Sequence, residues 1–162
     1  MKNGFKLMLV LTFFLLLIGL YPNTGIAEKH HFSLPKVVIV TTGGTVAMKY
    51  DQASGGVVPA LSGKDLIVAV PGLEKIANIE TVEFCNIDSS QMTPQMWRNL
   101  SSKIQGILDR SDVRGVVVTH GTDSMAEAAF FLETTLESEK PVVFVGAMRS
   151  ASGLSPDGPA NI

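Results

Sequence analysis

Cysteine is almost missing from this chain of 162 residues, which contains one Cys and three His. A single Cys excludes an internal disulfide, and the few Cys and His residues show none of the spacings of a zinc site. Charged residues are also scarce at 17%, the net charge is −2, and runs of like charge are absent. This composition excludes a basic nucleic-acid-binding protein and a disordered acidic chain. The 46% of hydrophobic residues suffices for the core of one domain.

Long apolar runs are also absent, except for the stretch from Leu7 to Leu20 near the N-terminus. Two Lys precede this stretch and a Gly-Ile-Ala tripeptide at residues 25–27 follows it, which is the order of an export signal. The run is shorter than the ~20 residues of a membrane-spanning helix, which favours cleavage over the alternative of an uncleaved anchor. The sequence therefore predicts a signal peptide over residues 1–27. The mature chain, residues 28–162, is then expected in the periplasm or outside the cell, without stable membrane association.

Beyond residue 28, apolar blocks alternate with amphipathic ones. Runs of β-branched residues predict strands, and apolar residues three or four positions apart predict helices. Thr93-Pro94 is a typical helix start, with Thr at the N-cap and Pro at the first helical position. The order predicts an α/β fold, a parallel sheet with helices on both faces in a Rossmann-like or flavodoxin-like three-layer arrangement. The expected strands are 36–41, 79–87, 115–119 and 142–146, and the expected helices are 63–70, 94–110 and 124–136.

Loops rich in hydroxyl, glycine and carboxylate groups follow all four expected strands. The carboxyl ends of parallel strands lie at one edge of a sheet, and open α/β sheets bind their ligands there. The four loops therefore predict a single site at this edge. They are Thr41–Thr45, Asp88–Gln91, Thr119–Asp123 and Gly146–Ser150.

The residues in these loops indicate which chemistry such a site can perform. Gly43 and Gly44 let the backbone approach a ligand closely. Thr45 follows them in a tight turn as a candidate nucleophile, which needs a base to take its proton. Thr122 and Asp123 stand at the start of an expected helix, whose N–H groups favour negative charge. Asp123 is in addition a fixed anion that can bind a substrate ammonium.

Each of these features also has a plainer interpretation. The glycines could belong to a phosphate-binding loop, although the sequence lacks the lysine and the glycine spacing of the common phosphate motifs. Helix capping could be the only role of Asp123, and Asp88 and Ser89 could have no role beyond ending a strand. His120 is expected to be a hydrogen-bonded structural residue, and Cys85 a buried thiol without chemistry.

Two motifs taken together resemble the signatures of the bacterial-type L-asparaginases. The first is Thr-Gly-Gly-Thr-Val-Ala at residues 42–47, and the second is His-Gly-Thr-Asp-Ser-Met at residues 120–125. The likeness runs from about Pro35 to the last residue and includes Gly-Ala-Met-Arg at 146–149 and Asp-Gly-Pro at 157–159. Together with the export signal, the chain resembles the secreted, type II branch.

The resemblance implies roles for five residues. Thr45 matches the nucleophile, which attacks the side-chain amide of L-asparagine and forms a β-aspartyl enzyme, and Thr122 matches the second catalytic Thr. Asp123 matches the carboxylate that binds the substrate α-ammonium. Ser89 falls where the family's Ser binds the α-carboxylate, and Ser90 lies beside it, where some members carry Gln. The resemblance further implies no metal or cofactor, a homotetramer built as a dimer of dimers, and L-glutamine as a possible second substrate.

The sequence departs from the family pattern in two places. Residues 54–59, in the loop after the nucleophile, contain no Tyr, which many relatives use to hydrogen-bond the Thr hydroxyl; Tyr50 is nearby but in another register. The chain also ends at Ile162, before the Lys that activates the second Thr and before a second domain. Residues 28–162 are therefore expected to be an incomplete N-terminal domain, inactive alone. The rival interpretations are a nucleotide-binding or other small-molecule-binding α/β domain, a fragment without function, and a related amidohydrolase that acts on glutamine (a glutaminase-asparaginase) or on tRNA-bound substrates.

Overall fold

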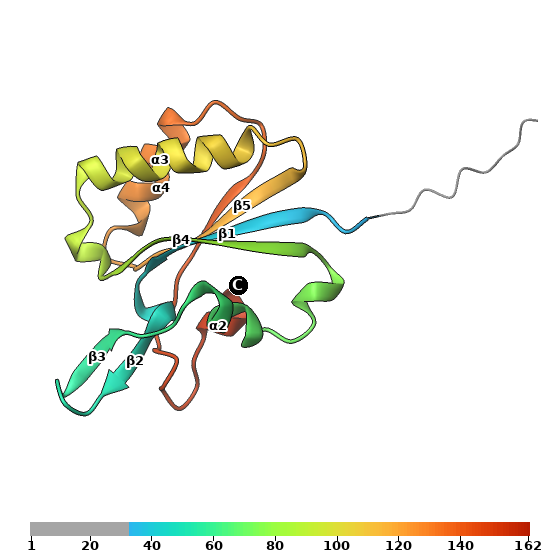
Figure 1. Ribbon diagram of the computed structural model, residues 1–162. Coiled ribbons are helices and arrows are strands. Elements are labelled where there is room, and N and C mark those ends of the chain that lie inside the picture. Colours follow the sequence, from blue (N-terminus) through green and yellow to red (C-terminus); the bar gives the residue numbers. More distant parts are fainter. Residues whose placement is uncertain (1–32) are drawn as a thin grey trace, which may run out of the picture. The chain divides into compact units, whose positions relative to one another are not determined.

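A computed structural model describes residues 33–162 of the chain (Figure 1). The expected signal peptide, residues 1–27, lies outside the described residues. Within the described part no helix is long and apolar enough to cross a membrane. The strands are β1 (Lys36–Gly43), β2 (Met48–Asp51), β3 (Gly56–Pro59), β4 (Asn78–Ile87), β5 (Val113–Thr119) and β6 (Val142–Val145). The α-helices are α2 (Gly63–Val68), α3 (Pro94–Leu108), α4 (Met125–Thr135) and α5 (Gly158–Asn161), and short 3₁₀ helices are η1 (Thr45–Ala47), η2 (Leu73–Lys75) and η3 (Ser89–Gln91).

Four strands form one parallel sheet in the spatial order β4-β1-β5-β6. The parallel α/β arrangement that the sequence predicts is therefore confirmed. The expected elements differ from the observed ones mainly at their ends. β1 continues two residues farther, to Gly43, and β5 begins two residues earlier, at Val113.

Helices α3 and α4 cover one face of the sheet (Figure 1). Helix α3 begins as predicted, because the Thr93 hydroxyl oxygen accepts a hydrogen bond from the Met96 N–H at 3.3 Å and Pro94 occupies the first turn. Its apolar stripe is buried against β1 and β5, which stabilises the helix through tertiary packing rather than through propensity. This core is formed by Val38, Val40, Met92, Leu100, Ile104, Ile107, Leu108, Val113, Val116, Val118 and Leu132.

Helix α2 packs on β1 and β4 from the other face. It begins with a capping box, in which Ser62 and Asp65 exchange hydrogen bonds between side chain and backbone. A Cβ atom at Gly63 would lie 3.2 Å from the Thr41 methyl group and 3.3 Å from Thr81. The small residue therefore lets the helix approach the two strands closely, and helices lie on both faces of the sheet.

The hairpin formed by β2 and β3 is the one strand pair that the sequence does not predict. Its strands are antiparallel, with Tyr50 opposite Val57, and the Asp51 carboxylate accepts hydrogen bonds from the N–H groups of Ala53 and Ser54 in the turn. The segment carries charged residues and glycines instead of an apolar alternation, so its hydrophobic pattern gives no signal. The Tyr50 N–H donates to the Ser152 hydroxyl at 2.7 Å, which ties the hairpin to the body of the domain.

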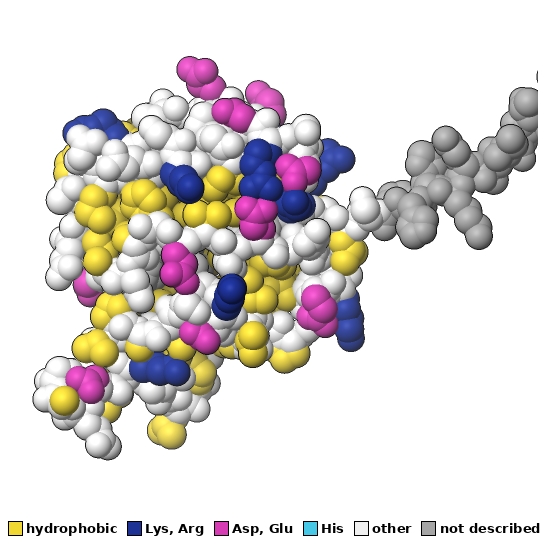
Figure 2. All heavy atoms as spheres, in the orientation of Figure 1, with side chains coloured by type: hydrophobic (Ala, Val, Ile, Leu, Met, Phe, Trp, Pro, Cys, Tyr) yellow, Lys and Arg dark blue, Asp and Glu magenta, His cyan; other side chains and the backbone are white. Residues whose placement is uncertain are grey.

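Four charged side chains meet at the amino ends of β1, β4 and β5, where Figure 2 shows basic and acidic groups side by side. Arg110 donates two hydrogen bonds to the Glu80 carboxylate, at 2.7 and 2.8 Å. Asp112 accepts from Lys36 at 2.6 Å and from Arg110 at 3.3 Å. The Lys36 hydrogen bond, followed by that of Arg110, lowers the pKa of Asp112 from 3.8 to about 2.

We expect Asp112→Asn to lower the melting temperature at pH 7 and to have little effect at pH 2. The folded-state pKa of Asp112 lies below its unfolded value, so its contribution is present above pH 3.8 and is lost as the pH falls toward 2. Because the ion pairs of Asp112 are partly exposed, the expected decrease in melting temperature is small. Thermal melting of the protein expressed from its complete open reading frame checks this, with Glu74→Gln, an exposed acid outside the cluster, as the control. An equal decrease in melting temperature at pH 7 and at pH 2 would contradict this prediction.

Candidate active site

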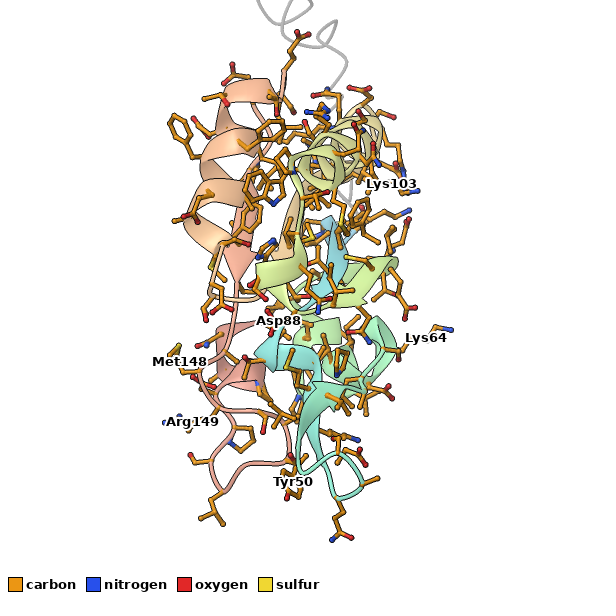
Figure 3. The ribbon with its side chains drawn as sticks, turned by 90° about the vertical axis from the view of Figure 1, so that its left-hand side faces the viewer. Tyr50, Lys64, Asp88, Lys103, Met148 and Arg149 are labelled. Carbon is orange, nitrogen blue, oxygen red and sulfur yellow. The ribbon has the colours of Figure 1, made fainter. Side chains whose placement is uncertain are left out.

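The loops after the four parallel strands lie together at one edge of the sheet, which faces the viewer in Figure 3 with Asp88 near its middle. The Gly44 N–H donates to the Ile87 carbonyl at 3.0 Å, which joins the loops after β1 and β4. The His120 N–H donates to the Val145 carbonyl at 2.9 Å, where β5 and β6 end. The strand order thus brings hydroxyl, carboxylate and glycine residues from distant parts of the sequence to one place.

The glycines of the first loop are required by close backbone contacts. Gly43 and Gly44 have φ angles of +101° and +77°, which L-residues with a side chain rarely adopt. A Cβ atom at Gly43 would lie 2.4 Å from the Ile87 carbonyl oxygen, and one at Gly44 would lie 2.4 Å from the Gly121 nitrogen. The two motifs that the sequence analysis singled out therefore touch through their backbones. The Thr42 hydroxyl fixes the loop further by donating to the Thr119 carbonyl at 2.8 Å.

Thr45 is the first residue of η1 and is half-buried at this edge. Within residues 33–162, no side chain or backbone group forms a hydrogen bond with its hydroxyl. The hydroxyl is therefore free to approach a bound substrate, but it still needs a group that takes its proton. The tight Gly43–Gly44 turn places Thr45 at this edge of the sheet.

Ser89 joins the loop after β4 to the loop after β5. It is buried, and its hydroxyl oxygen accepts a hydrogen bond from the Asp123 N–H at 3.2 Å. Its carbonyl accepts from the Ser124 hydroxyl at 2.7 Å. A Cβ atom at Gly121 would lie 2.5 Å from the Ser89 hydroxyl oxygen, so only glycine fits there. Because the Ser89 hydroxyl uses a lone pair toward Asp123, its own proton remains for a ligand.

Thr122 and Asp123 are exposed in the turn between β5 and α4. The N-cap of α4 is Ser124, and no side chain caps that helix. The interpretation of Asp123 as a helix cap is therefore wrong. Gly146, from the loop after β6, lies against the same turn, because a Cβ atom there would be 3.3 Å from the Thr122 methyl group. The Asp123 carboxylate remains at the surface of the edge, where a ligand can reach it.

Asp88 and Ser90 form a second small cluster beside these residues. The Asp88 carboxylate accepts hydrogen bonds from the Ser90 hydroxyl at 2.6 Å and from the Ser90 N–H at 2.9 Å. The hydrogen bond from the Ser90 hydroxyl, followed by that from the Ser90 N–H, lowers the pKa of Asp88. The resemblance to the family implies a substrate contact for Ser90, whereas the sequence indicates for Asp88 only the end of a strand. The feature of the sequence that could have indicated a role for Asp88 is its position in an Asp-Ser-Ser run directly after a strand.

A family model described as the N-terminal part of asparaginase matches residues 36–162. The chain belongs to the asparaginase family. It is 43% identical to L-asparaginase 2 of Escherichia coli over 132 residues, which cover 80% of this chain and 37% of that protein. It is 40% identical to L-asparaginase 2-3 of Saccharomyces cerevisiae over 156 residues, which cover 95% of this chain and 43% of the relative. The chain thus spans about two fifths of the length of these relatives.

A solved structure shares the fold of this asparaginase domain. It is a probable cytoplasmic L-asparaginase from Campylobacter jejuni, 42% identical, with a TM-score of 0.69 over 78% of this chain and 37% of that one. Another relative, from Haemophilus influenzae and 41% identical, is named a probable periplasmic L-asparaginase. The names of the relatives therefore include both cellular locations.

His120 is a buried, hydrogen-bonded residue at this edge, as expected, whereas Cys85, expected to be buried, is half-buried. His120 is fully buried with its Nδ1 2.8 Å from the Gly121 carbonyl, and burial lowers the pKa of the imidazole. The Cys85 thiol donates to the Thr42 carbonyl at 3.2 Å, and burial raises its pKa to about 11, which keeps it protonated and unreactive. Within residues 33–162, no group of three His, Cys, Asp or Glu residues could hold a metal ion.

Proposed function

We propose that this chain supplies the nucleophile-bearing part of an L-asparaginase, which hydrolyses L-asparagine to L-aspartate and ammonia. The observation that carries the proposal is the contact of Gly44 with Gly121, which holds the Thr45 loop against the Thr122 loop. The Thr45 hydroxyl of one motif and the Thr122–Asp123 turn of the other therefore lie at the same edge of the sheet. The relatives named L-asparaginase, at 40–43% identity, support the same reaction.

In the proposed first step, the Thr45 hydroxyl oxygen attacks the side-chain amide carbon of L-asparagine and loses its proton. The amide nitrogen of the tetrahedral intermediate takes up that proton and leaves as ammonia, and a β-aspartyl ester remains on Thr45. Water then attacks the ester carbon, which releases L-aspartate and restores the hydroxyl. Thr122, on the neighbouring loop, is proposed to relay protons in these steps, activated by the Lys that the family places outside these 162 residues.

Ser89 and Asp123 are proposed to hold the ends of the amino acid that do not react. The Ser89 hydroxyl can donate its proton to the substrate α-carboxylate because its oxygen already accepts from Asp123. The exposed Asp123 carboxylate can bind the α-ammonium, since within residues 33–162 it forms no ion pair. Fixing both groups orients the side-chain amide, and such orientation is a large part of an enzymatic rate enhancement.

The direct test is hydrolysis by the protein expressed from the complete open reading frame that contains these residues. We expect ammonia and L-aspartate in equal amounts from L-asparagine, and the same assay with L-glutamine measures the ratio of the two activities. Activity on L-glutamine alone would make the protein a glutaminase. Absence of ammonia from both amides would contradict the proposed function.

We also propose that the protein is exported and that cleavage removes residues 1–27. The two early Lys, the apolar run and the Gly-Ile-Ala site support this. Cleavage would change the net charge from −2 to −4, because residues 1–27 contain two Lys and no acidic residue. We expect mass spectrometry of the purified protein to find Glu28 as its first residue. An N-terminus at Met1 in a membrane fraction would indicate the uncleaved anchor instead.

The oligomeric state follows from family membership as a further proposal. We propose a homotetramer, a dimer of dimers, for the protein expressed from the complete open reading frame. Light scattering coupled to size-exclusion chromatography measures its mass directly. A monomer that still hydrolyses L-asparagine would contradict the proposed assembly without affecting the proposed reaction.

A further inference from the structure

The Ser90 side chain is held in one orientation by Asp88. Its hydroxyl donates to the Asp88 carboxylate at 2.6 Å, a length typical of a charge-assisted O–H···O bond. The Ser90 N–H donates to the same carboxylate oxygen at 2.9 Å, which fixes the backbone next to the side chain. Ser90 is exposed and Asp88 is half-buried, and the donation to Asp88 uses the one proton of the Ser90 hydroxyl.

We propose that Asp88 is a positioning residue for the substrate amine: by accepting the Ser90 proton, it turns Ser90 into a pure hydrogen-bond acceptor. This inference rests on the proposed function, and it adds a residue for which sequence analysis gave only a structural end-of-strand interpretation. A hydroxyl has one proton and two lone pairs, so a Ser whose proton is committed can receive a donor but cannot donate to a carboxylate. An ammonium group, with its three N–H donors, fits this oxygen, whereas a carboxylate does not.

The neighbouring groups are consistent with this division of roles. The Asp123 N–H donates to the hydroxyl of Ser89, the residue before Ser90, which ties the Asp123 turn to the segment that contains Asp88 and Ser90. Within residues 33–162 neither Asp88 nor Asp123 forms an ion pair, and the basic residues labelled in Figure 3 lie away from Asp88. Asp123 thus supplies the charge for the ammonium, and Ser90 supplies an oriented acceptor. Ser89, which keeps its proton, remains for the carboxylate.

The test compares L-aspartate with succinate, which has the same two carboxylates but no amine. Calorimetry on the protein expressed from the complete open reading frame gives both dissociation constants without requiring turnover. We expect Asp88→Ala to weaken L-aspartate binding about tenfold, the size of one lost hydrogen bond to a charged group. Succinate binding should change less than about twofold. The KM for L-asparagine should rise in parallel, while kcat changes little.

A double-mutant cycle separates positioning from helix capping, because Asp88 also caps η3. If Asp88 acts through Ser90, Asp88→Ala has no further effect on L-aspartate binding in a Ser90→Ala background. Asp88→Asn keeps an oxygen acceptor for the Ser90 hydroxyl and should restore most of the affinity. Thr93→Ala, which removes the comparable cap of α3, serves as the matched control and should leave both ligands unaffected.

Three results would overturn the inference while leaving the proposed function intact. The first is that Asp88→Ala lowers the affinities for L-aspartate and succinate equally. The second is that Asp88→Ala lowers L-aspartate affinity as much in the Ser90→Ala background as in the wild type. The third is that Asp88→Asn binds L-aspartate as weakly as Asp88→Ala does. Thermal melting shows whether each variant folds. If Asp88→Ala does not fold, the binding of L-aspartate and succinate is compared in the Ser90→Ala and Asp88→Asn variants instead. A parent protein that neither binds L-aspartate nor hydrolyses L-asparagine would overturn both proposals together.

Discussion

Thr45→Ala is expected to reduce kcat/KM for L-asparagine by roughly 10⁴-fold or more, the scale on which nucleophile removal acts in enzymes with a covalent intermediate. The substitution removes the hydroxyl oxygen that carries the acyl group, so the covalent route is closed. Thr45 is half-buried, and within residues 33–162 no group hydrogen-bonds its hydroxyl, so the substitution breaks no hydrogen bond of this part of the chain. Ammonia release by the protein from the complete open reading frame measures the rate, and a melting curve checks that the fold survives.

Two control variants make this result specific. Thr45→Ser keeps a hydroxyl at the same position and should retain part of the activity. Thr93→Ala removes an equal number of atoms from a Thr that caps α3, and it should lower the free energy of unfolding by about 1 kcal/mol with an unchanged kcat. Near-normal turnover of Thr45→Ala would exclude Thr45 as the nucleophile, whatever the two controls show.

The sheet and its helices could be predicted because their signals are local. The strands beginning at Lys36 and Val113 are runs of β-branched residues, and such runs are typical of parallel strands buried on both faces. Thr93-Pro94 marks the start of α3 through the chemistry of the cap. The β2–β3 hairpin could not be predicted, because its strands are largely exposed and are held by a turn rather than by an apolar pattern.

The candidate site could be predicted as a set of residues but not as a set of contacts. Parallel strands bring their carboxyl ends to one edge, and this rule alone groups Thr45, Ser89, Thr122 and Asp123. The contact of Gly44 with Gly121 and the orientation of Ser90 by Asp88 depend on three-dimensional distances. A carboxylate at the end of a strand is usually only a cap, so the sequence offers little reason to assign Asp88 to the substrate.

The described domain leaves a considerable apolar surface on one side of the sheet. Strand β6 pairs only with β5 among the described strands, Val143 on it is 50% exposed, and Phe130 on α4 is 71% exposed. An open groove between α4 and β6 is lined by apolar side chains that include Leu136 and Phe144 and by the charged side chains of Glu133, Glu139 and Lys140. Large exposed apolar side chains such as Val143 and Phe130 are typical of a face that other structure covers.

We expect the 162-residue chain, expressed alone, to release no ammonia from L-asparagine above the blank. It spans 37% of the E. coli relative, and the Lys proposed to activate Thr122 is one that the resemblance places outside these residues. General-base assistance contributes about 10²–10⁴-fold in rate, so its loss alone would be severe. An open site also leaves water around Thr45 and Asp123, which weakens each electrostatic contact with the substrate. The protein from the complete open reading frame, assayed in parallel, provides the positive control.

The same chain is expected to bind hydrophobic dyes and to associate, because the apolar face over β6 and α4 would then meet water. Dye fluorescence and light scattering measure this independently of activity. Ammonia release by the 162-residue chain that disappears in Thr45→Ala would show that the site is complete without further residues. A monomeric chain with a single cooperative melting transition would contradict the expected association alone. Ammonia release therefore tests whether the catalytic site is complete, and dye binding, light scattering and melting test whether the hydrophobic core is complete.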